Sequence, residues 1–74
     1  MAKWGNHKTM WIEVGEYDTA FCNPLSPNLS VHRKDGTIDI ITFDPAINGS
    51  VFDYQYQIIR FGANRILIDI SLID

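Results

Sequence analysis

The last third of the chain, residues 51–74 with the sequence VFDYQYQIIRFGANRILIDISLID, contains two runs in which apolar and polar side chains alternate. Side chains of a β-strand point in turn to opposite faces of its sheet, so a two-residue period predicts strands with one buried face. We expect strands at Val51–Ile59 and Arg65–Ile73, joined by a short hairpin loop. Either Gly62 or Asn64 is expected to supply the left-handed backbone conformation that such a loop needs.

The second of these strands raises the question of what covers its edges. Between residues 66 and 73 it has no lysine, proline or glycine, and Asp69 is its one charged residue. Edge strands usually carry such residues, because unpaired backbone groups invite pairing with another chain. The strand therefore either lies centrally in a closed barrel or pairs with another chain. We favour the second arrangement, which predicts a homo-oligomer formed through Arg65–Ile73.

Four shorter runs predict further strands in the first two thirds of the chain. They lie at Lys8–Val14, Tyr17–Cys22, Leu29–Arg33 and Thr37–Phe43. Between the last two runs, Asp35 can accept local hydrogen bonds and Gly36 tolerates positive φ. We therefore expect these two runs to form an antiparallel hairpin.

The remaining signals define the fold class. Asp44 and Pro45 are typical of the cap and first position of a helical turn, which Asn48-Gly49 would end. Residues 1–74 are short enough for a single domain. We predict a mainly β fold, a small antiparallel barrel or sandwich of five to six strands with at most one short helical turn near residues 44–48. Residues 1–8 are a candidate flexible N-terminal arm.

Composition restricts the classes of partner. The net charge is −3, and the six basic residues are spread along the chain, which disfavours a strong grip on a nucleic-acid backbone. No apolar run approaches the ~20 residues that span a membrane, and the N-terminus has no apolar signal region. A single cysteine, Cys22, excludes a disulfide within one chain and suits a cytoplasmic protein.

Motifs for catalysis are absent from the sequence. Cys22, His7 and His32 do not have the spacing of metal ligands, and no nucleophile elbow or phosphate-binding loop is present. The aspartates are explained by turns and by polar strand faces. The sequence therefore predicts a protein that is not an enzyme and has no metal or other cofactor.

The leading functional hypothesis is a small domain that docks on or occludes a partner protein. Small acidic β domains of this kind are typical of phage- or plasmid-type inhibitors and accessory factors. Aromatic anchors inside a charged rim are frequent in protein interfaces. The expected partner-binding residues are Trp4, Trp11, Glu13, Glu16, Tyr17 and Asp18.

Two alternatives are kept. The expected face of Phe52, Tyr54 and Tyr56 is either core or a platform for stacking bases, as in OB-type domains. The stretch KWGN at residues 3–6 resembles the start of the swapped-hairpin DNA-binding antitoxins, but His7 replaces their serine and no arginine follows in the next strand. The resemblance would imply nucleic-acid binding.

The second alternative function is that of an oligomer with a small-ligand site between subunits.

Overall fold

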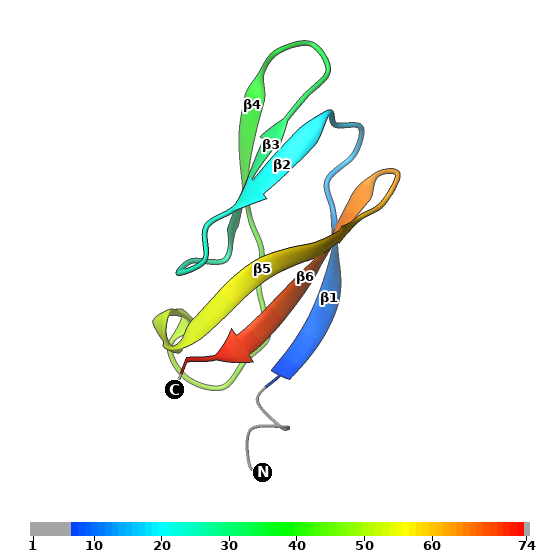
Figure 1. The fold of residues 1–74 in the computed structure, drawn as a ribbon. Coiled ribbons are helices and arrows are strands. Elements are labelled where there is room, and N and C mark those ends of the chain that lie inside the picture. The colour runs from blue at the N-terminus through cyan, green and yellow to red at the C-terminus, as the bar shows by residue number, and fades with distance from the viewer. Residues whose placement is uncertain (1–6, 74) are drawn as a thin grey trace.

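The structure, a computed structural model, describes residues 7–73 (Figure 1). Trp4 and the KWGN stretch lie outside the described residues. The first strand already begins at His7, so residues 7 and 8 belong to a sheet rather than to the N-terminal arm that we expected.

The described chain forms two antiparallel sheets of three strands each, which confirms the predicted mainly β fold. The first sheet has the strand order β1-β6-β5 and the second has the order β2-β3-β4. The strands are β1 (His7–Glu13), β2 (Thr19–Cys22), β3 (Asn28–His32), β4 (Ile38–Thr42), β5 (Tyr54–Phe61) and β6 (Arg65–Leu72). In Figure 1 the two sheets lie one above the other, with β2 and β5 next to each other. Among residues 7–73 no ladder joins these two strands, so the sheets do not close into a barrel.

The strand β6 is central, which bears on the oligomer that we expected to form through it. It pairs with β1 on one side and with β5 on the other, so both of its edges are occupied within one chain. The lack of lysine and proline in this strand therefore reflects a central position, which was the other arrangement considered. Edge pairing of another copy with β6 would require β1 or β5 to be displaced, so β6 offers no free edge for the homo-oligomer expected through Arg65–Ile73.

The predicted hairpin of the second sheet is confirmed. β3 and β4 pair in antiparallel register, and the amide of Arg33 donates to the carbonyl oxygen of Thr37 across the turn at 2.8 Å. Gly36 has φ +93°, as the turn requires. The carboxylate of Asp35 accepts bonds from the amide and the hydroxyl of Thr37, at 3.0 and 2.7 Å. These bonds hold the pKa of Asp35 below its usual value.

The hairpin of β5 and β6 is also confirmed, but its loop works differently from the prediction. Neither Gly62 nor Asn64 has positive φ. Glycine is needed at 62 because a Cβ there would lie 2.9 Å from the backbone oxygen of Arg65 and 3.2 Å from a ring carbon of Trp11. A shift in register between Ile58 and Arg60 adds a β-bulge to β5.

The helical turn found within residues 7–73 lies later than predicted. Residues 44–48 are not helical, because the side chain of Asp44 accepts a bond from the amide of Ala46 at 2.9 Å and closes a tight turn with Ala46 at φ +52°. The helical turn instead spans Val51–Asp53, where the hydroxyl of Ser50 caps the amide of Phe52 at 3.1 Å.

The core receives side chains from both sheets. Its buried residues are Ile12, Val14, Ala20, Leu29, Val31, Phe43, Tyr54, Tyr56, Ile66, Ile68 and Ile70. The ring of Phe43 meets Tyr56 edge-on, with centroids 5.9 Å apart. Two of the three aromatic side chains assigned to one face, Tyr54 and Tyr56, are core residues. Phe52 is 68% exposed, because it lies in the helical turn before the strand alternation begins.

Candidate functional site at the seam between the sheets

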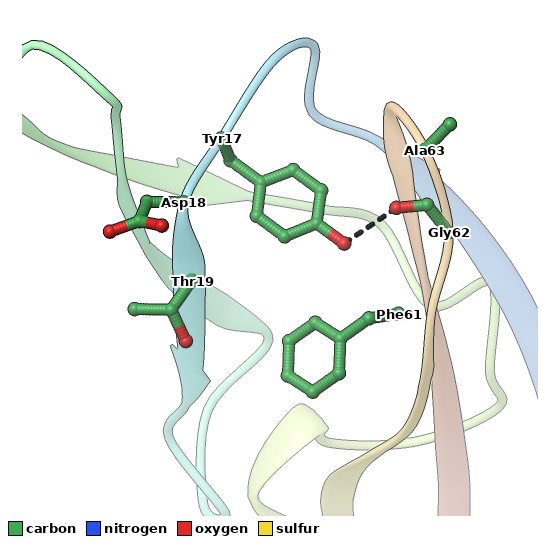
Figure 2. A pocket seen from close by; sticks show the side chains of 6 residues that line it. All are labelled: Tyr17, Asp18, Thr19, Phe61, Gly62 and Ala63. Carbon is green, nitrogen blue, oxygen red and sulfur yellow. Dashed lines mark hydrogen bonds between the residues drawn. The ribbon is translucent and has the colours of Figure 1, made fainter.

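The most distinctive surface feature is the line along which β2 and β5 face each other, which we call the seam. Each of these strands is the last one in its sheet. The amide of Tyr56 donates to the carbonyl oxygen of Pro24 at 3.1 Å at one end. At the other end the hydroxyl of Tyr17 donates to the carbonyl oxygen of Gly62 at 2.6 Å (Figure 2). These two bonds show that the strands run antiparallel along the seam.

The hydrogen-bond pattern of β2 directs alternate backbone groups into the seam. In an antiparallel pair, opposite residues exchange bonds at every second position. The amide of Asn23 donates to the oxygen of Asn28, and the register continues with Phe21 opposite Ser30. The residues that bond to β3 are therefore odd-numbered. Ala20 and Cys22 turn their N–H and C=O groups away from β3 and towards β5.

The strand β5 likewise directs alternate backbone groups into the seam. The amide of Ile73 donates to the oxygen of Asp53, so Gln55 and Gln57 are the next residues that exchange bonds with β6. Tyr56 and Ile58 therefore direct their backbone groups away from β6. The bond from Tyr56 to Pro24 is independent support for this phase.

Between its two ends the seam is open. In the described part of the chain no backbone hydrogen bond joins Ala20 or Cys22 to β5. An open groove of about 450 Å³ lies there. It is lined by Thr19, Ala20, Phe21, Cys22, Pro24, Tyr56, Gln57, Ile58 and Phe61. None of these residues is charged, so the groove offers apolar contacts and backbone hydrogen-bonding groups.

A second hollow lies beside the groove at the Tyr17 end, where Figure 2 shows the side chains of Tyr17 and Phe61 extending from opposite sides into the gap, with one ring above the other. Their centroids are 6.2 Å apart, and Phe61 is 54% exposed. The two hollows share Thr19 and Phe61, so they lie next to each other along the seam. Asp18 lies at the rim and supplies the one carboxylate of this hollow.

Two titratable groups of the groove are less acidic than usual. Burial raises the pKa of the Cys22 thiol from 9.0 to about 11. Burial also raises the pKa of Tyr56, whose hydroxyl donates to the carbonyl oxygen of Val51 at 2.8 Å. Both groups are therefore neutral at pH 7. A protonated thiol is a poor nucleophile, so the environment of Cys22 does not favour covalent catalysis.

The predicted partner-binding residues do not form one surface in the described structure. Tyr17 and Asp18 lie at the seam, whereas Glu16 faces a hollow beside the β3–β4 turn. Trp11 and Glu13 lie on the outer face of the first sheet, with Glu13 opposite Arg65 in the register. The guanidinium of Arg65 lies 4.1 Å above the half-buried ring of Trp11, which gives that ring a partner within the chain.

The groove residues were missed because the sequence does not show which strands face each other without pairing. Phe21, Cys22 and Phe61 share no motif. A signal was nevertheless present, because the run Tyr17–Cys22 was short and Phe61 stood at a hairpin end.

Other chemistry finds little support among residues 7–73. No group of three or more histidine, cysteine or acidic side chains gathers there in a way that could hold a metal ion. The same residues include no helix of sufficient length and apolar character to cross a membrane.

A comparison of the chain with protein-family models, curated proteins and solved structures finds no match. The geometry of the seam is therefore the basis on which a function can be inferred.

Proposed function

We propose that this protein is a non-enzymatic binding domain that takes an extended segment of a partner protein along the seam. One observation carries the proposal: a strand edge with backbone groups directed outwards lies beside an open, uncharged groove. An extended peptide can add to such an edge as a further strand, so that its backbone supplies affinity and its alternate side chains supply specificity.

The edge of β2 is the one that we assign to pairing. Ala20 and Cys22 would exchange hydrogen bonds with the incoming segment, while β5 forms the opposite wall through Ile58 and Phe61. The bond between Tyr17 and Gly62 closes one end of the seam through a single side chain. The seam can therefore open at that end without breaking the backbone hydrogen bonds between paired strands. Because the groove has no charged lining, the segment that fits it carries apolar side chains at alternate positions.

Such binding would cover a segment of the partner protein. A domain without catalytic groups could act in this way as an inhibitor or accessory factor, because the covered segment is no longer accessible. The proposal keeps the predicted mode of action, docking on a protein, and moves its centre from the tryptophans to the seam. Tyr17 and Asp18 remain part of the proposed site, at its rim.

The test begins with a display library of peptides of about eight residues, since a strand of that length spans roughly 26 Å. Peptides that bind are then resynthesised with one N-methyl group at each backbone nitrogen in turn. Strand addition predicts that methylation at alternate positions abolishes binding, because only every second amide bonds to β2. Equal tolerance of methylation at all positions, or no binding peptide at all, contradicts the proposal.

Amide exchange followed by NMR provides the matching measurement on the protein. A bound peptide is expected to slow exchange at Ala20 and Cys22, whose amides face the seam. Phe21 serves as the internal control, because its amide is directed to β3 with or without peptide. Protection that appears equally at all three amides would indicate general stabilisation instead of strand addition.

A further inference from the structure

The outer face of the second sheet exposes apolar side chains that nothing in the described chain covers. Leu29 and Val31 are fully buried, so Ser30 and His32, which alternate with them, lie on the outer face. The register places Phe21 and Ile40 on either side of Ser30, and Ile38 next to His32. Phe21, Ile38 and Ile40 are 59%, 56% and 63% exposed.

These exposed side chains form one surface. The ring of Phe21 meets the ring of His32 edge-on at 5.2 Å, which joins the first two strands of the face. Ile38 and Ile40 occupy the third strand. Apolar residues gathered on one side of a sheet are typical of a surface that another protein covers, whereas single exposed apolar residues need no explanation.

The charge of this face identifies the kind of partner that fits it. The outward residues of the three strands are Thr19, Phe21, Asn28, Ser30, His32, Ile38, Ile40 and Thr42, with no aspartate, glutamate, lysine or arginine among them. The whole chain carries a net charge of −3. The mild repulsion between two copies is therefore not reinforced by any charged side chain on this face. A partner selected by charge would find nothing to recognise here.

We infer that a second copy of this chain covers this face, so that the β2-β3-β4 sheets of two copies pack together about a symmetry axis. A two-fold arrangement needs a surface that is complementary to itself, and an uncharged apolar face meets that need. Packed sheets lie about 10 Å apart, with their side chains interdigitated. The small Ser30 between Phe21 and Ile40 leaves space for an apolar side chain of the other copy.

The size of the face sets the expected strength. Three strands spaced about 4.8 Å apart, with about five residues each at 3.3 Å, cover roughly 240 Å² in projection. The accessible area is therefore a few hundred Å² per copy, below the ~800 Å² per partner of standard interfaces. We expect a weak dimer whose population depends on concentration. The face shares Thr19 and Phe21 with the groove, but Ile38 and Ile40 do not line the groove, so this inference goes beyond the proposed function.

The test is the molar mass in solution, measured by sedimentation between about 10 μM and 1 mM, which brackets weak association. The full chain is expected to shift from monomer towards dimer over this range. Ile40→Glu places a carboxylate on the apolar face, so it should remain a monomer with a circular-dichroism melting curve like that of the parent. Ile59→Glu is the matched control, since Ile59 is 48% exposed on β5, and it should associate like the parent.

Four outcomes overturn the inference. In the first, the parent protein stays monomeric at the highest concentration. In the second and third, the Ile40→Glu variant still associates, or the Ile59→Glu variant loses association to the same extent. In the fourth, the protein is a monomer and a different protein binds its outer face. If Ile40→Glu does not fold, Ile38→Lys takes its place, because Ile38 is exposed on the same face. Neither variant alters the groove, so peptide binding should persist in both.

Discussion

The hydroxyl of Tyr17 donates a 2.6 Å hydrogen bond to the carbonyl oxygen of Gly62, a residue 45 positions later in the chain. This bond joins the loop that follows β1 to the turn that follows β5. At the other end of the seam the closing bond is between backbone groups, from the amide of Tyr56 to Pro24. The two ends of the seam are therefore closed by different means, and the Tyr17 end is the one that a single substitution can open.

Tyr17→Phe should lower the free energy of unfolding by about 1 kcal/mol, the usual net value of one hydrogen bond. The ring would still lie against Phe61, so the loss isolates the hydroxyl. Urea unfolding measures this change. Tyr54→Phe is the control, because the 3.1 Å bond that it removes joins Tyr54 to Asn48, which is only six positions away in sequence. Only Tyr17→Phe should speed amide exchange of Asp18 and Thr19, the nearest amides along the chain that are bonded to β3. Unchanged exchange there would show that the bond does not hold the seam.

Gly62→Ala should destabilise the fold by about 1–3 kcal/mol, as overpacking does. The added Cβ would meet the backbone oxygen of Arg65 at 2.9 Å, and a backbone atom cannot move aside as a flexible side chain can. Ala63→Ser, at the exposed next position, should leave thermal unfolding unchanged. A Gly62→Ala variant as stable as the parent would mean that the turn relaxes freely.

The strand alternation made both hairpins predictable, because it depends on neighbours in sequence. The local chemistry of Asp35 and Gly36 predicted the turn between β3 and β4, and the alternation assigned Ile66 and Ile68 to the buried face of β6. It could not show that β6 is central. That position depends on pairing with β1, more than fifty residues away in sequence, and alternation looks the same in central and edge strands.

The candidate site was less predictable than the fold, because it depends on which surfaces remain uncovered. Alternation shows that the side chains of Ala20 and Phe21 point to opposite faces of β2, but it does not show which of the two faces is buried. The helical turn was misplaced for a local reason. Asp44 and Ser50 are both capping residues, and Asp44 is used in a tight turn with Ala46.

Arg33→Lys should cost more stability than Asp39→Asn, although the two side chains form an ion pair at 2.8 Å. Asp39 is 55% exposed, so the pair itself is expected to contribute less than about 1 kcal/mol. Arg33 also donates to the carbonyl oxygens of Val14 and Glu16, which fastens the loop after β1 to the second sheet. A lysine ammonium has its three N–H groups on one nitrogen and cannot place them as the guanidinium does, with Nε at Asp39 and Nη1 at the two carbonyl oxygens, so a loss of about 2 kcal/mol is expected. Chemical denaturation of both variants decides the order. The opposite order would mean that the surface ion pair dominates.

The thiol of Cys22 should react slowly with iodoacetamide in the folded protein, because burial raises its pKa to about 11. At pH 8 this lowers the thiolate fraction by about 100-fold, and the greater nucleophilicity of a more basic thiolate recovers about tenfold. We therefore expect a net protection of about tenfold relative to the protein in urea, measured by mass spectrometry. The rate should continue to rise with pH beyond 9 and level off near 11. A plateau near pH 9 in the folded protein would contradict the buried environment of the thiol.

The same raised pKa affects stability at alkaline pH. The folded state holds the thiol proton more tightly than the unfolded state, whose thiol titrates near 9.0. The resulting stability is fully present below about pH 9 and is lost as pH rises through about 11. Because burial raises the pKa of Tyr56 as well, both groups destabilise the fold in this direction. Cys22→Ala should therefore reduce the alkaline loss without abolishing it. An unchanged slope of unfolding free energy against pH between 9 and 11 would assign the loss to Tyr56 alone.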